Sequence, residues 1–397
     1  MGEGKQSALF PSYARFPITI VKGKGSRLWD DQGKEYLDFV SGLAVTNLGH
    51  APDEVKSRLA AQLDELWHVS NLFHIPQQEQ LARLLTENSV ADAVFFCNSG
   101  AEANEAAIKI ARRYNAKVLG RDRYEIVTFH SSFHGRTLAT LTATGQDKVK
   151  EGFHPLPQGF VYAPYNDAGA LKDYVTDKTC AIMLEMMQGE GGVHPAGDDF
   201  VQEVVRLCRE HDLLLIVDEI QTGMGRTGKL FAYEHYGLEP DIFTLAKGLG
   251  SGFPVGAMLA KAKLIDAFAA GSHGSTFGGT PLAMTAGLAT LETMLAEKLP
   301  ERVDALGAKF MAMLRDSIGS NPLVKEIRGR GFLIGIACTV PVAGIISHIH
   351  ERGLLVVSAG PDVIRLLPNF RVTEEELRKA ADIIGAVLAE NAAAASR

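Results

Sequence analysis

Residues that could do chemistry stand directly after five apolar runs of this sequence. Ser99, Gly100 and Ala101 follow the run 93–98, and Phe133 and Arg136 follow the run 125–130. Glu190 follows 180–185, Gln221 follows 213–218, and Lys247 follows 241–246. Continuous apolar runs of this length favour buried strands of a parallel sheet. The carboxyl ends of parallel strands lie at one edge, where α/β proteins bind ligands. We therefore expect these side chains to share a site.

The first of these positions has the pattern of a helix start. Ser99 stands three residues before Glu102, as in a capping box, and helix-forming residues continue through 101–115. Free N–H groups at a helix N-terminus bind anions, and Gly100 would let a phosphate approach the backbone closely. An ordinary helix cap without a ligand is the alternative.

The second and third positions suit a flat ligand that carries a carboxylate. Phe133 could stack on a ring, and Arg136 could hold a carboxylate through two hydrogen bonds. A core phenylalanine and a surface arginine are the alternative. The three glycines within residues 188–192 allow a close approach of the backbone, or they form a surface turn.

An acid and a lysine follow the last two runs. Asp218 ends an apolar run, so its carboxylate needs a partner or a cationic ligand unless solvent reaches it. Lys247 could be a desolvated amine suited to Schiff-base chemistry, although most lysines are solvated charges. The combination fits pyridoxal 5′-phosphate, whose phosphate needs N–H donors, whose ring nitrogen needs a carboxylate and whose aldehyde needs an amine.

The elements that position these residues predict an α/β fold. Apolar runs alternate with helical patterns such as 200–212, and a further strand is predicted at 255–260. Beyond residue 281 the pattern changes to helices with a turn and strand, which predicts a smaller α+β unit. The expected elements there are helices at 283–299, 301–318 and 373–389 and a turn and strand over 327–338, with a hairpin at 25–39 joining the same unit.

The composition excludes several classes of function. The chain has 397 residues and a formal charge of −7, so it lacks the basic surface that binds nucleic acid or anionic lipid. Its four cysteines show no metal-binding spacing and are typical of buried thiols in a reducing compartment. We see no signal peptide at the start and no apolar run long enough for a membrane span. A cytoplasmic protein without a metal site is expected.

Several motifs give the chain a strong resemblance to the class III aminotransferases of fold type I. These motifs are NSGAEANEAAIKIAR, SFHGRTLATLTATGQ, DEIQTGMGRTG, TLAKGLGSGFPVGA and HGSTFGGTPLA, and the resemblance extends from Phe10 to Ala389. It implies a large domain with a mostly parallel seven-stranded sheet flanked by helices, and a smaller α+β domain. The implied boundaries are 1–55 for an N-terminal segment, 56–285 for the large domain and 286–397 for the small domain.

The resemblance implies a role for each cofactor-binding residue. Lys247 would bind the aldehyde of pyridoxal 5′-phosphate covalently, and Asp218 would pair with the ring nitrogen. Gln221 would bond the ring hydroxyl, and Phe133 would stack on the ring. The remaining residues expected at the cofactor are Ser99, Gly100, Ala101, Glu219, Ile220 and, from the second subunit of an obligate homodimer, Thr276.

The resemblance also implies the substrate contacts. Arg136 and Ser275 would hold the carboxylate end of the substrate, and Glu190 and Arg365 match the paired switch residues of the family. The segment RLLPNFRVT, which contains Arg365, has one proline where relatives usually have two. GHAPDEV likewise stands where relatives usually have His-Pro after Gly-His.

Residues 11–50 are most similar to the members that act on N-acetylornithine. These enzymes move its δ-amino group to 2-oxoglutarate in arginine biosynthesis. Ornithine aminotransferases have a tyrosine at the position of Leu43, which could bond a free α-amino group that a leucine cannot. Enzymes acting on ornithine, succinyldiaminopimelate or 4-aminobutyrate are the nearest alternatives, with an aminomutase or decarboxylase of the same fold further away.

Overall fold

A computed structural model describes residues 8–395 of the chain. Its centre is a seven-stranded sheet in the order β4-β12-β11-β10-β7-β5-β6. The strands are β4 (Ala93–Cys97), β12 (Gly256–Ala260), β11 (Ile242–Leu245), β10 (Leu214–Asp218), β7 (Thr179–Leu184), β5 (Glu125–Phe129) and β6 (Phe160–Ala163). Only β12 runs against the direction of the others in this sheet. The predicted mostly parallel sheet is confirmed, and β6 is the strand that the apolar pattern did not predict.

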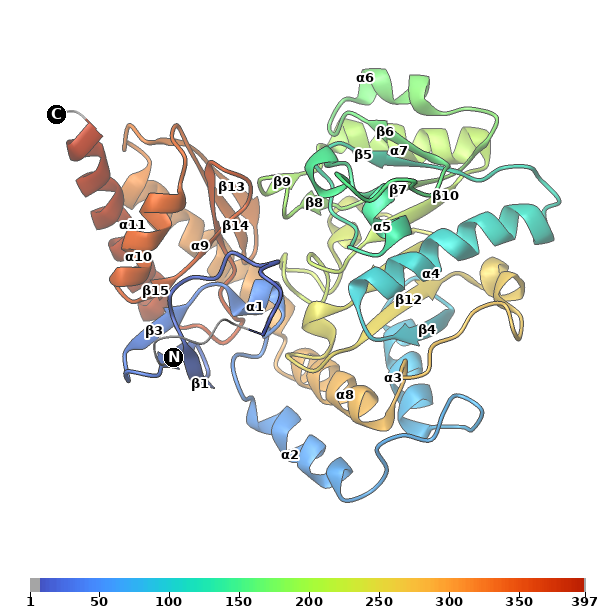
Figure 1. The fold of residues 1–397 in the computed structure, drawn as a ribbon, viewed down its shortest axis with the longest axis horizontal. Helices are drawn as coiled ribbons and strands as arrows, with labels where there is room; N and C mark the ends of the chain where they lie inside the picture. The colour runs from blue at the N-terminus through green and yellow to red at the C-terminus, as the bar shows by residue number, and fades with distance from the viewer. Residues whose placement is uncertain (1–7, 396–397) are drawn as a thin grey trace.

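Helices cover both faces of this sheet because its strands are apolar on both sides. Leu214 and Ile216 of β10 pack in one cluster with helix α4 (Gly100–Arg113). Leu215 and Val217 pack in the other cluster with α7 (Asp198–His211). The two helices lie on opposite sides of the sheet in Figure 1. Successive side chains of a strand point to opposite faces, so a strand buried on both sides has no polar alternation.

Further elements complete this part of the chain. They are α2 (Asp53–Leu63), α3 (Pro76–Glu87), α5 (Leu138–Ala143), α6 (Ala168–Leu171), α8 (Pro281–Ala296) and the small pair β8 (Met187–Gln188) and β9 (His194–Pro195). The predicted helices at 101–115, 200–212 and 283–299 are confirmed as α4, α7 and α8 within a few residues at each end.

The C-terminal part is built on an antiparallel sheet, which lies to the left in Figure 1. The sheet has the order β13-β14-β17-β16, with β13 (Val324–Arg330), β14 (Leu333–Cys338), β17 (Val363–Leu366) and β16 (Val357–Ser358). Its helices are α9 (Leu299–Ile318), α10 (Ala343–Glu351) and α11 (Glu374–Ala395). The expected helices and the expected turn and strand of this part are therefore confirmed.

The N-terminal segment joins a strand from the C-terminal part in a second small sheet. Its order is β1-β2-β3-β15, with β1 (Ile20–Lys24), β2 (Arg27–Asp30), β3 (Glu35–Asp38) and β15 (Leu354–Leu355). The hairpin expected over residues 25–39 is present as β2 and β3. The domain boundaries at 55/56 and 285/286 remain predictions, and both fall inside helices, α2 and α8.

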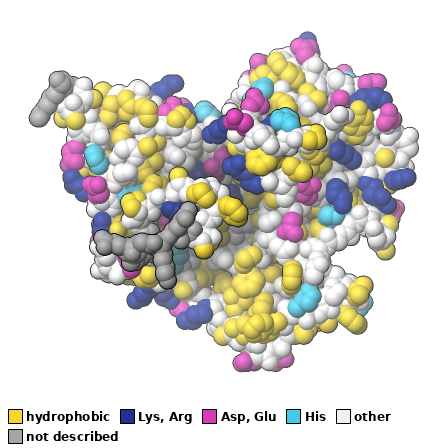
Figure 2. Space-filling view, in the orientation of Figure 1, with side chains coloured by type: hydrophobic (Ala, Val, Ile, Leu, Met, Phe, Trp, Pro, Cys, Tyr) yellow, Lys and Arg dark blue, Asp and Glu magenta, His cyan; other side chains and the backbone are white. Residues whose placement is uncertain are grey.

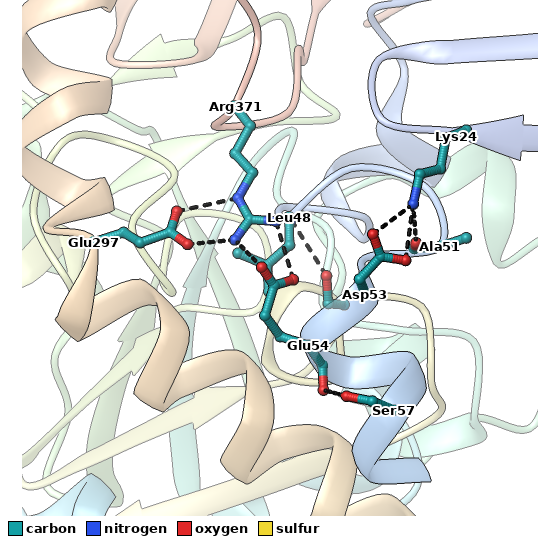
Figure 3. A network of polar contacts seen from close by, with 9 residues as sticks. Lys24, Leu48, Ala51, Asp53, Glu54, Ser57, Glu297 and Arg371 are labelled. Carbon is teal, nitrogen blue, oxygen red and sulfur yellow. Dashed lines mark hydrogen bonds and ion pairs between the residues drawn. The ribbon is translucent and has the colours of Figure 1, made fainter. Parts of the chain in front are cut away.

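A charged contact joins three distant parts of the chain at the surface. Arg371, which follows β17, bonds the carboxylates of Glu54 in α2 and Glu297 at the end of α8, as Figure 3 shows. Lys24 of β1 pairs with Asp53 beside it at 2.9 Å. Exposed pairs contribute about 0–1 kcal/mol each, so burial of the apolar faces supplies most of the stability.

Candidate active site

A cavity of about 440 Å³ lies at the carboxyl ends of β4, β5, β10 and β11. The structure brings together there the predicted residues Ser99, Gly100, Ala101, Phe133, Arg136, Asp218, Ile220, Gln221 and Lys247. This grouping is what a sheet of parallel strands dictates, because the segments that follow its strands meet at one edge. Glu185, His134 and Asn98 also line the cavity.

The start of α4 forms one end of the cavity. Ser99 caps the helix by accepting a hydrogen bond from Glu102 N at 3.2 Å, and the Glu102 carboxylate accepts one from Asn98 N at 2.8 Å. A Cβ on Gly100 would lie 2.8 Å from Ile220 Cδ1, so a larger residue here requires the Ile220 side chain to shift. The N–H groups of a first helical turn have no partner inside the helix, and they are suited to an anion.

Asp218 ends β10 and is 3% exposed. Its Oδ2 lies 2.8 Å from both Asn104 Nδ2 and His134 Nδ1, and its Oδ1 accepts from Ile220 N at 3.0 Å. Burial by itself lowers the pKa of His134, but the hydrogen bond and charge of Asp218 raise it overall. Thr244 fixes the amide by donating to Asn104 Oδ1 at 2.8 Å. These donors stabilise a negative charge on Asp218 at the cavity wall.

Lys247 follows β11 and starts a short 3₁₀ turn, Lys247–Leu249. Its φ is 42°, a left-handed conformation that costs a side-chain-bearing residue free energy. Burial lowers the pKa of its amine, helped by the charge of Arg365 and opposed by Glu190 and Asp218. Its ammonium forms no hydrogen bond or ion pair with the residues that the structure describes. An amine with a lowered pKa and no partner is suited to attack a carbonyl carbon.

Glu185 places a second carboxyl group in the cavity wall. Its Oε2 accepts a hydrogen bond from Phe133 N at 3.0 Å, so it holds the backbone that carries the aromatic ring. Burial raises the pKa of Glu185, against the opposing charge of His134.

A cluster behind the cavity holds the expected switch pair. Arg365 Nη1 lies 2.5 Å from Glu190 Oε1, 3.0 Å from Gly189 O and 3.1 Å from Gln221 Oε1. Burial raises the pKa of Glu190, but the charge and hydrogen bond of Arg365 lower it overall. Gln221 lines the cavity, so it connects the pair to the space where a ligand would lie.

Comparisons with known proteins agree with this geometry. Residues 10–388 match the family model described as Aminotransferase class-III.

The chain belongs to the class III aminotransferases.

It is 55% identical over 382 residues to the acetylornithine aminotransferase of Halalkalibacterium halodurans, covering 96% of this chain and 98% of that protein. The N-acetylornithine aminotransferase structure from Stenotrophomonas maltophilia has a TM-score of 0.83 at 37% identity, covering 96% and 98% of the chains. An ornithine aminotransferase structure from Toxoplasma gondii, described with partial occupancy of PLP at its active site, has a TM-score of 0.93 at 34% identity, covering 97% of this chain and 94% of that chain. The fold type I class and the aminotransferase activity expected from the resemblance are thereby confirmed.

Some expected residues of this aminotransferase do not line the cavity. Glu219 points away because consecutive residues of an extended segment alternate in direction, and Asp218 already faces the site. Its carboxylate accepts from Thr222 Oγ1 at 2.6 Å and Tyr233 N at 2.8 Å, and burial raises its pKa to about 7. Glu219 does not line the cavity, and the expectation that it binds the cofactor stays a prediction.

Leu43 also lies outside the cavity. It is 41% exposed and belongs to a short turn, α1 (Ser41–Ala44), whose residues have left-handed φ angles. Val45 lines the cavity in its place.

Ser275 and Thr276 lie at the far side of the α4 start. Ser275 Oγ accepts from Asn98 Nδ2 at 3.2 Å, which puts it near the expected phosphate end. Thr276 is exposed in this chain, and its expected contact across a subunit boundary stays a prediction.

The residues of the aminotransferase site that were not predicted from the sequence include Asn98, Asn104, His134, Glu185 and Val45. His134 lies inside the motif that indicated Phe133 and Arg136, so an imidazole beside an expected acid was an available signal. Asn104 gave no such signal, because a polar residue on a helix is usually solvated.

Proposed function

We propose that this aminotransferase uses pyridoxal 5′-phosphate to move the δ-amino group of N2-acetyl-L-ornithine to 2-oxoglutarate. The products are N-acetyl-L-glutamate 5-semialdehyde and L-glutamate. The observation that carries the proposal is an unpartnered Lys247 in the same cavity as a buried, multiply bonded Asp218 and an open helix start. The relative from Halalkalibacterium halodurans, which is 55% identical, is named acetylornithine aminotransferase, and this supports the choice of donor.

The residues present fit the cofactor. Its phosphate suits the N–H groups at the start of α4, where a Cβ on Gly100 would crowd the Ile220 side chain. Its ring nitrogen suits Asp218, which is braced by Asn104 and His134. Phe133 would cover a face of the ring. When bound, the cofactor supplies an electrophilic carbon and a ring that accepts an electron pair.

The chain's own residues would then do the proton chemistry. Lys247 takes the proton from the δ-carbon of the donor and later returns a proton to the carbon that receives the amine, acting first as base and then as acid. Its lowered pKa suits both steps, since a neutral amine can accept the proton. Asp218 holds the proton on the ring nitrogen.

Arg136, Ser275, Glu190 and Arg365 would select the two substrates. The donor carries its amine far from its carboxylate, whereas the acceptor is a 2-oxo acid with a carboxylate beside the reacting carbon. Glu190 neutralises Arg365 for the donor and must release it for the acceptor. The Glu190–Arg365 contact at 2.5 Å matches the state that fits the donor.

Leu43 would favour the acetylated donor over ornithine. A free α-ammonium beside a leucine loses water without gaining a partner, whereas an acetyl group carries no charge. Because Leu43 lies outside the cavity of its own chain, such a contact requires the segment to move or to face the site of a second subunit.

The proposal includes a homodimer with shared active sites, in which Thr276 reaches the cofactor of the partner. Apolar side chains are exposed between α2 and α3, namely Leu63, Leu66, Trp67, Leu72 and Phe73. Figure 2 shows hydrophobic side chains gathered over this region. Clusters of this kind mark protein interfaces.

We also assign the enzyme to the cytoplasm. All four cysteines are buried and free, as expected in a reducing compartment. No helix among residues 8–395 is long and apolar enough to cross a membrane.

An amine-donor panel with 2-oxoglutarate as acceptor tests the function. N-acetylornithine should give glutamate faster than ornithine, succinyldiaminopimelate or 4-aminobutyrate. The protein should be yellow, and borohydride should fix the chromophore on the peptide that contains Lys247. Label on another lysine, or normal turnover of Lys247→Ala, would refute the mechanism. Release of carbon dioxide or amine migration without glutamate would indicate a decarboxylase or an aminomutase.

A further inference from the structure

Arg226 is a charged residue that the mechanism above does not use, and it is 0% exposed. It lies in the loop that follows β10, eight positions beyond Asp218. No carboxylate among the described residues bonds to its guanidinium, and its Nε has no partner there. A buried cation held only by neutral groups is costly, so its position calls for an explanation beyond general stability.

The guanidinium bonds three separate segments of the chain. Nη1 donates to Pro368 O at 2.5 Å and to Phe332 O at 3.1 Å, and Nη2 donates to Asn47 Oδ1 at 2.6 Å. The guanidinium carbon also lies 4.7 Å from the centre of the Phe370 ring. A planar fork of donors can hold three acceptors at once, which a lysine ammonium on a flexible stem does not do in the same geometry.

Two of these segments, those of Pro368 and Asn47, form part of the site. Pro368 lies three residues after Arg365, directly beyond the end of β17. Asn47 lies two residues after Val45, which lines the cavity, and its side chain packs so closely on Gly248 that an added Cβ would lie 2.1 Å from it. Gly248 is the neighbour of Lys247. Arg226 thus connects the loop after Asp218 to both substrate-facing walls.

We propose that Arg226 is a positioning residue that fixes Arg365 for the carboxylate of the 2-oxo acid. Its hydrogen bonds hold the segment after β17 and the segment around Asn47 against the loop after β10. Arg365 has one guanidinium nitrogen shared among Gly189, Glu190 and Gln221, so a small shift of β17 changes all three contacts. This inference rests on the proposed function, because it assumes a dicarboxylate acceptor.

Arg302 offers a matched control on the same segment. It also donates to backbone carbonyls, to Phe370 O and Val372 O at 3.0 Å each, but it comes from α9 and its side chain is exposed. Arg302→Lys therefore loosens the segment without breaking the connection to Asn47 or to the loop after β10.

The test compares Arg226→Lys, Arg302→Lys and the wild type as holoenzymes. Calorimetry measures the Kd of glutarate, an unreactive dicarboxylate, and steady-state kinetics measures the KM of each substrate. Arg226→Lys should raise the glutarate Kd and the 2-oxoglutarate KM by about 10-fold to 100-fold, as expected for a misplacement near 1 Å. The KM of the donor should change less than these two values do. Arg302→Lys should leave the glutarate Kd within about twofold even where its melting temperature falls.

Asn47→Ala serves as a second variant if Arg226→Lys does not fold, and it should raise the glutarate Kd in the same direction. A glutarate Kd that stays within twofold in the Arg226 and Asn47 variants would overturn the inference and leave Arg226 as a purely structural residue. A wild type that binds glutarate but does not transaminate N-acetylornithine would refute the proposed function, while the Kd comparison would still decide the role of Arg226.

Discussion

Replacing Glu190 with glutamine removes the charge that neutralises Arg365 while keeping the shape of the side chain. Arg365 has only 2% of its side chain exposed, whereas Glu190 has 29% exposed. After the substitution, Arg365 keeps its hydrogen bonds to Gly189 O and Gln221 Oε1. The variant therefore tests the charge of Glu190 with little change in packing.

The magnitude follows from the burial of the pair. Deleting one partner of a buried ion pair costs about 3–5 kcal/mol, but the glutamine oxygen and two other acceptors remain, and Glu190 is partly exposed. The loss is then the difference between a charge-assisted and a neutral hydrogen bond, about 1–1.5 kcal/mol, or roughly a factor of ten. This loss falls on the state that fits N-acetylornithine, while substrates with a carboxylate for Arg365 no longer have to displace Glu190. The ratio of kcat/KM for glutamate over N-acetylornithine should rise by about 10-fold to 100-fold.

Single-turnover measurements of the two half-reactions check this prediction, with each amino donor mixed separately with the holoenzyme. Glu203→Gln is the control, because Glu203 pairs with Arg206 on α7 at 2.8 Å and does not line the cavity. It should leave the ratio unchanged. If Glu190→Gln slows both half-reactions equally, Glu190 is a structural acid and the switch role is wrong.

Three further predictions concern other residues of the site. Mixing Lys247→Ala subunits with Thr276→Ala subunits should restore part of the activity in heterodimers, and heterodimers that form without activity would count against a shared site. Leu43→Tyr should reduce a preference for N-acetylornithine over ornithine of at least about tenfold in kcat/KM, and an unchanged ratio would exclude Leu43 as the discriminator. Burial raises the pKa of Glu219 to about 7, so the folded state holds its proton more tightly and this group makes stability fall as the pH rises from about 4.5 to about 7. Glu219→Gln should remove that fall, up to about 3 kcal/mol in the free energy of unfolding between pH 5 and 8, and the same pH slope in both proteins would refute the assignment.

The large-domain sheet was predictable because its strands are apolar on both faces. Runs such as 180–185 and 213–218 have no polar alternation, so burial on both sides is their only stable placement. The parallel direction then places Asp218 and Lys247 at one edge. The strand β6 escaped prediction because three of its four residues are only partly buried and it lies at the edge of the sheet.

The contacts behind the site were not predictable from the pattern. Asn104 and Asp218 are 114 residues apart in sequence, yet their side chains are 2.8 Å apart. Such a contact depends on the packing angle between α4 and the sheet, which hydrophobic spacing alone does not determine. The role of Arg226 was hidden for the same reason, since its acceptors come from three distant segments.

The departure of RLLPNFRVT from the usual two prolines has a local explanation. Asn369 Nδ2 donates to Ser26 Oγ at 2.9 Å, and Asn369 Oδ1 accepts from Arg371 N at 3.0 Å, so this side chain anchors the segment to the N-terminal hairpin. Its own N–H has no backbone acceptor among residues 8–395, which is the condition that lets a proline occupy the same position. Arg365 faces the other way, toward Gly189, Glu190 and Gln221. The asparagine therefore fixes this segment by hydrogen bonds where a proline would fix it by its ring. The contacts of Arg365 with Gly189, Glu190 and Gln221 remain intact.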